Sequence, residues 1–142
     1  MIISKLDAAM HQLNLAINLF LAGDFLGSLT LAGAAEDILG GLCRAAGKPA
    51  SADSIADYHE KDVDPTVPAE KRHGVVLTVL NRARNSAKHA NWADENTIEI
   101  DQIHPLQMLM RAIPMCVSLG VKPSGEIETM VHWVEEHPEA QE

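Results

Sequence analysis

The chain has 142 residues, 46% hydrophobic and only 4% aromatic, with 11 Lys and Arg against 20 Asp and Glu for a net charge of -9. This length fits one domain over residues 1–142, and the hydrophobic share excludes a disordered chain. The negative charge argues against a protein that coats nucleic acid or anionic membrane, because both would repel it at long range. No apolar run approaches the roughly 18 residues of a membrane span, and Cys43 and Cys116 form no paired motif. We therefore expect a soluble, cytoplasmic protein with reduced thiols and no membrane partner.

Two amphipathic helices are predicted at the start of the chain. Apolar residues recur at helical spacing over residues 6–20, and Ser4 is suited to cap the first turn. A turn at Gly23 leads to a second helix, capped by Asp24 and ending at Gly47. The second helix is rich in Gly and Ala, which lets another backbone approach closely. The two helices are expected to form an antiparallel hairpin.

The middle of the chain changes in character. Residues 48–68 contain three prolines and five acidic residues, which predicts a long acidic connecting loop with one helical turn around Ser54 to His59. A third helix is predicted over residues 68–90. Residues 97–100 then alternate between apolar and polar in the manner of a short strand.

Two further helices complete the predicted fold. The fourth, over residues 105–119, is apolar almost all round, which places it at the centre of the protein or in a subunit interface. A fifth helix is capped by Ser124, and residues 135–142 are expected to be a solvated tail. The predicted fold class is all-α, an up-and-down bundle of four to five helices.

The third predicted helix is set apart by its charge. Residues 71–93 contain five basic residues and no acidic one, so the rest of the chain has six basic residues against 20 acidic. A run of like charge is often a solvated surface. It is also what a local binding site for phosphate requires. The basic residues are Lys71, Arg72, Arg82, Arg84 and Lys88.

The end of this helix carries the sequence Arg84-Asn85-x-x-x-His89, which resembles the R-x4-6-H motif of HEPN domains. The Gly- and Ala-rich second helix, which contains Glu36, is also similar to that family, and the resemblance extends from Leu6 to Trp92. HEPN domains are small helical bundles. The resemblance implies a homodimer that acts as a metal-independent endoribonuclease, a toxin or defence effector, with a nucleotidyltransferase-type antitoxin as partner.

The residue types suit this chemistry. Cleavage of RNA without a metal requires attack by the 2′-hydroxyl, stabilisation of charge on phosphorus and protonation of the leaving oxygen. An Arg provides fixed donors that match a phosphate, and a His exchanges protons near neutral pH. The predicted catalytic residues are therefore Arg84, His89 and Asn85.

Four other residues are predicted to support this site. Arg82, Lys88 and Trp92 are candidates for RNA binding, the Trp by stacking on a base. Glu36 is expected to pair with Arg84 or Arg82, either as part of the site or as a structural partner.

The spacing of the motif raises a geometric problem. Residues five apart on a continuous helix point about 140° away from each other, so Arg84 and His89 do not share a face. Two solutions remain open: the helix loosens near residues 85–89, or a two-fold dimer brings two copies of the motif into one cleft.

A metal centre is the first alternative to this function. Glu70 and His73 form a single Glu-x-x-His pair, whereas a di-iron bundle needs two such pairs and further carboxylates, so neither a metal nor another cofactor is predicted. The remaining alternative is a non-catalytic helical module that dimerises or binds a partner protein or a nucleotide. Cleavage of RNA that depends on His89 distinguishes the two.

Overall fold

The computed structural model describes residues 1–90, 95–123 and 125–141, which contain seven α-helices and no β-strand. The predicted all-α class is therefore confirmed, but the helices number seven where four or five were predicted. Their bounds are α1 Lys5–Leu21, α2 Phe25–Ala45, α3 Ser51–His59, α4 Ala69–Leu80, α5 Arg82–Lys88, α6 Ile103–Ser118 and α7 Glu126–Glu136, with short 3-10 helices η1 Glu60–Asp62 and η2 Pro138–Gln141.

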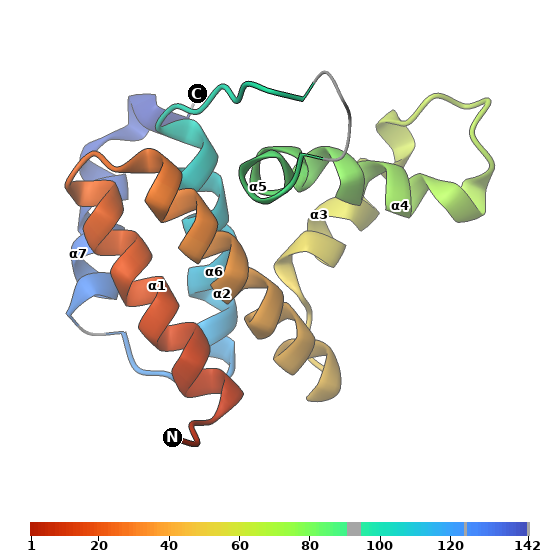
Figure 1. Cartoon of the computed structure of the whole chain (residues 1–142). Coiled ribbons are helices and arrows are strands. Elements are labelled where there is room, and N and C mark those ends of the chain that lie inside the picture. The colour runs from red at the N-terminus through yellow and green to blue at the C-terminus, as the bar shows by residue number, and fades with distance from the viewer. Residues whose placement is uncertain (91–94, 124, 142) are drawn as a thin grey trace.

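The first two helices form the predicted hairpin. Ser4 Oγ accepts a hydrogen bond from the Asp7 amide at 2.9 Å and Asp24 Oδ1 accepts one from the Gly27 amide at 2.9 Å, so both helices begin at the predicted caps. Between them Gly23 has φ +85°, a conformation that favours glycine. Figure 1 shows α1 and α2 packed along each other, beside α6 and α7.

α2 and α6 form the centre of the core. α6 packs against both α2 and α1. Its apolar sequence left open a central position or a subunit interface, and within the chain it is central. α2 is also the one helix of the described residues that is long and apolar enough to cross a membrane, by length and composition alone. Its residues Leu29, Leu39 and Cys43 are fully buried, so its apolar character is explained by the core and is compatible with a soluble protein.

The predicted acidic loop contains a helix. α3 occupies nine residues of the 48–68 segment and buries the small side chains of Ala52 and Ala56. The sequence predicted only one helical turn, around residues 54–59, because Ala contributes little to a hydrophobic pattern, although it has the highest helix propensity. α3 packs against α4 and α6, so α3 and α4 lie to one side of the α1–α2–α6–α7 bundle (Figure 1).

The other corrections concern residues 68–90 and two short segments. The third helix predicted there is divided into α4 and α5 at Asn81. Residues 97–100 are without regular structure, because no second strand among the described residues pairs with them. The C-terminal segment is not only a solvated tail: the His137 ring stacks on Trp133 at a centroid distance of 4.1 Å, and Ala140 packs partly against the core.

Candidate functional site

The break between α4 and α5 is held by an arginine from α6. Asn81 ends α4 and precedes α5, with φ -100° and ψ 3°. Its Oδ1 accepts a hydrogen bond from Arg111 Nη2 at 2.9 Å, and the Leu80 carbonyl accepts one from Arg111 Nη1 at 3.2 Å. Arg111 thus binds the end of α4 and the residue at the break, which provides a reason for the helix to stop there.

A buried carboxylate connects this arginine to α5. Glu36, only 4% exposed on α2, binds Arg111 Nη2 through Oε1 at 2.9 Å and Arg84 Nη1 through Oε2 at 3.3 Å. Arg84 Nη1 also donates to Asp37 Oδ1 at 2.6 Å. We call Glu36, Asp37, Arg84 and Arg111 the buried charge network. It joins α2, α5 and α6, and it contains the predicted pairing of Glu36 with Arg84.

This network places Arg84 away from solvent. Its side chain is 8% exposed, and its guanidinium contacts two carboxylates, which would repel a phosphate. Arg84 therefore orients α5 in this structure, and its predicted contact with RNA phosphate is not part of the described geometry.

The other predicted residues of α5 lie outside. Asn85, Lys88 and His89 are exposed, and α5 ends at Lys88. His89 has extended backbone angles, φ -132° and ψ 148°, and its amide donates to the Asn85 carbonyl at 2.9 Å. The helix is regular up to Lys88, and Arg84 is buried while His89 is exposed, so the chain does not bring these two side chains together within one protomer. Trp92 lies outside the described residues.

A pocket of about 480 Å³, which we call the Arg82 pocket, lies beside α5. Arg82 and Ser86, one turn apart, line it together with Val79 of α4, His104 and Gln107 of α6, and the segment before α6, including Glu99. Its volume is within the range of small-molecule sites. Arg82 was predicted from the sequence, whereas His104 and Gln107 were not, because about 20 residues without a shared motif separate them from α5.

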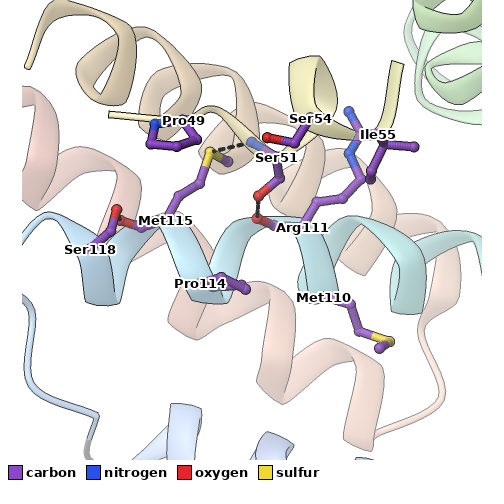
Figure 2. Close-up of a pocket in the computed structure, with 9 residues that line it drawn as sticks. All are labelled: Pro49, Ser51, Ser54, Ile55, Met110, Arg111, Pro114, Met115 and Ser118. Atoms are coloured by element: carbon purple, nitrogen blue, oxygen red, sulfur yellow. Dashed lines mark hydrogen bonds between the residues drawn. The ribbon is translucent and has the colours of Figure 1, made fainter. Parts of the chain in front are cut away.

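A second pocket, of about 430 Å³, lies between α3 and α6 and is mostly apolar (Figure 2). Ser51 of α3 joins the two helices: its Oγ donates to the Arg111 carbonyl at 2.7 Å, and its amide donates to Met115 Sδ at 3.4 Å. Arg111 is the one titratable residue of its lining, and the guanidinium is engaged by Glu36 and Asn81. This pocket therefore lacks a group for acid–base chemistry.

A third group of polar side chains joins α3, η1 and α4. His73 Nδ1 lies 3.0 Å from Asp57 Oδ1 and 3.4 Å from Glu60 Oε1, and His73 Nε2 lies 3.2 Å from Asp53 Oδ1. Asp53 also accepts from Arg44 Nε at 2.7 Å, and this hydrogen bond is the main reason that the pKa of Asp53 is lowered. Desolvation opposes protonation of His73, but hydrogen bonds to Asp53 and Asp57 outweigh it and raise the His73 pKa. Glu70, considered with His73 from the sequence, is not a member of this group.

Comparison with known proteins does not identify a family for this chain. No family model matches the chain, and no significant match was found among curated proteins or solved structures. The fold and site define a small all-helical protein in which a buried charge network fixes a short basic helix at the surface. Any narrower assignment depends on the chemistry of that helix.

Proposed function

We propose that this protein is a HEPN-like endoribonuclease that cleaves RNA without a metal ion, with the exposed end of α5 and the adjoining Arg82 pocket as its RNA-binding surface. One observation carries the proposal. α5 has no acidic residue, is fixed to the core by Arg84, and exposes Asn85, Lys88 and His89 at its end. A net charge of -9 on the whole chain does not prevent a local basic surface from holding a short RNA segment.

In this proposal His89 transfers the protons. It takes a proton from the 2′-hydroxyl or gives one to the leaving 5′-oxygen, and its exposure makes it accessible to a bound strand. Asn85 lies one turn earlier, and its backbone carbonyl accepts a hydrogen bond from the His89 amide. Lys88 and Arg82 provide the positive charge that binds phosphate, and the pocket beside Arg82 is large enough for a base.

Arg84 has a different role from the one that the HEPN resemblance implies. Because Glu36 and Asp37 engage its guanidinium, Arg84 is a positioning residue that holds α5 in place. The positive charge near the scissile phosphate then comes from Lys88, Arg82 or a second copy of the chain.

A homodimer is part of the proposal. Val75 and Val79, one turn apart on α4, are 39% and 54% exposed, and Val79 and the exposed Ile98 line the Arg82 pocket. Exposed apolar residues that adjoin one another are typical of interaction surfaces. A dimer formed through this surface includes the Arg82 pocket in its interface or at its rim.

The buried position of Arg84 favours a second candidate function. If the motif's arginine serves only the fold, the protein is a non-catalytic helical module, which binds a second copy, a partner protein such as a nucleotidyltransferase-type antitoxin, or a nucleotide in the Arg82 pocket. Both functions use the same surface. They differ in whether His89 transfers protons in the cleavage of RNA.

The test is cleavage of labelled single-stranded RNA by untagged protein, separated from any partner, in EDTA at several pH values. We expect cleavage by the native chain and by His132→Ala, a control at an exposed histidine of α7, and none by His89→Ala. Circular dichroism and size-exclusion chromatography should be the same for all three. Native protein that binds RNA and leaves it intact at every pH supports the binding module instead, and cleavage by His89→Ala contradicts the proposed role of His89.

A further inference from the structure

We propose that His73, Asp57 and Glu60 bind a divalent first-row transition-metal ion, with Zn²⁺ the best fit, between α3, η1 and α4. The site is built from elements other than α5 and does not depend on the proposed ribonuclease function. It revises the expectation, drawn from the sequence, that the protein holds no metal.

The spacing of the donor atoms fits such an ion. Nδ1 of His73 lies 3.0 Å from Asp57 Oδ1 and 3.4 Å from Glu60 Oε1, and one donor atom from each residue lies within 4.8 Å of the others. Around tetrahedral zinc, with bonds of about 2.1 Å, neighbouring donors are about 3.4 Å apart. Small side-chain rotations therefore suffice to bring the three donors into the zinc coordination sphere.

The histidine ring faces more acceptors than a neutral imidazole can serve. Carboxylates lie at both nitrogens, two at Nδ1 and Asp53 at Nε2, while a neutral ring has a single N–H. A protonated ring donates one N–H to each side, to Asp57 from Nδ1 and to Asp53 from Nε2. A metal ion bound at Nδ1 would take the place of the Nδ1 proton, while the Nε2 N–H is still donated to Asp53.

Asp53 and Arg44 provide the support that metal-binding histidines use. A histidine ligand usually donates its other N–H to a carboxylate, which fixes the ring and raises its basicity. Asp53 Oδ1 is 3.2 Å from Nε2, and Asp53 Oδ2 accepts from Arg44 Nε at 2.7 Å. Arg44, on α2, thus orients the carboxylate that orients the ring.

The donor types select the metal. One imidazole nitrogen with two carboxylates suits Zn²⁺ and its neighbours, whereas Mg²⁺ and Ca²⁺ prefer oxygen ligands alone. All three side chains are partly exposed, so water completes the coordination. The ion would link α3 and η1 to α4, whose main packing partners are α3, η1 and α5.

The test is titration of untagged, chelator-treated protein with Zn²⁺ by calorimetry at pH 7.5, together with elemental analysis and thermal unfolding. We expect one ion per chain and a higher unfolding temperature with Zn²⁺, with no competition from Mg²⁺ or Ca²⁺. His73→Gln and the double variant Asp57→Asn/Glu60→Gln should lose the binding. Asp53→Asn should weaken it about 10- to 100-fold, the usual effect of removing an outer partner.

The matched control is His132→Gln, which removes an exposed histidine that also lies near a carboxylate and should bind Zn²⁺ as the native chain does. Circular dichroism checks that every variant is folded. Absence of one-to-one binding by the native chain, or native-like binding by His73→Gln, overturns the proposal and leaves His73 as a structural partner of the three carboxylates.

Discussion

The aliphatic part of Arg84 packs so closely against Gly33 that a Cβ atom on this glycine would lie 2.5 Å from Arg84 Cδ. The close approach of α5 to α2 thus requires a glycine at this point. The same close approach brings the Arg84 guanidinium within hydrogen-bond distance of Glu36 and Asp37, one turn further along α2.

Replacement of this glycine should therefore destabilise the fold. In Gly33→Ala the new methyl group displaces Arg84, whose far end is held by carboxylates, and we expect a loss of about 1–3 kcal/mol of unfolding free energy. Urea unfolding measures it. The control is Gly41→Ala, at an exposed position of α2 with nothing within 4 Å of the new atom, which should stabilise the protein by about 0.5–1 kcal/mol. Equal effects of the two substitutions would contradict the close packing at Gly33.

Glu36 should contribute more to stability than its neighbour Asp37. Glu36→Gln leaves the buried Arg111 guanidinium without its carboxylate and leaves Arg84 with Asp37 as its remaining carboxylate partner. Removal of one partner from a buried ion pair costs about 3–5 kcal/mol. Asp37 is 55% exposed, so Asp37→Asn should cost about 1 kcal/mol or less. Chemical unfolding of both variants checks this order. At high salt the loss caused by Asp37→Asn should shrink more than the loss caused by Glu36→Gln, because salt screens a half-exposed ion pair more than a buried one. A Glu36→Gln protein as stable as the native chain would contradict it.

The buried charge network shows what the sequence could and could not predict. The R-x4-6-H spacing drew attention to Arg84, and the small-residue context of Glu36 suggested their pairing. Arg111 is 75 positions from Glu36 and lies in a helix predicted from its apolar residues, so no local pattern connected it to either residue. Arg84 is buried because α2, α5 and α6 meet at this point. The periodicity of apolar residues along a single helix does not predict such a meeting.

The helix boundaries were predictable where capping chemistry defines them. Ser4, Gly23 and Asp24 have the predicted roles at the hairpin, because their short side chains or lack of one act locally. The break at Asn81 was not predicted, since it depends on Arg111 binding Asn81 and the Leu80 carbonyl from another helix. The loop predicted at 48–68 hid α3 for a related reason: its buried residues are alanines, and α3 is packed by the distant helices α4 and α6.

Both cysteines should be slow to react in the folded protein. Cys43 and Cys116 are fully buried, and desolvation raises the pKa of Cys116. A raised pKa lowers the thiolate fraction at every pH below it, and the thiolate is the reactive form. With a thiol-specific disulfide reagent at pH 7.5, we expect slow reaction of the native protein and rapid reaction of two thiols per chain in guanidinium. Immediate reaction of one thiol in the native protein would show that its helix opens.

The salt dependence of RNA binding should report on the exposed cations of α5. Each phosphate contact made to a single strand contributes about 0.7 to the slope of log affinity against log salt concentration. If Arg82 and Lys88 each bind a phosphate, Arg82→Ala/Lys88→Ala should reduce that slope by about 1.4 and weaken binding at low salt, while stability is little changed because both side chains are exposed. Lys71→Ala, an exposed cation near the start of α4, is the control and should leave the slope unchanged. Fluorescence anisotropy with a short labelled RNA gives both slopes. Equal slopes for the double variant and the native chain would place the RNA elsewhere on the protein.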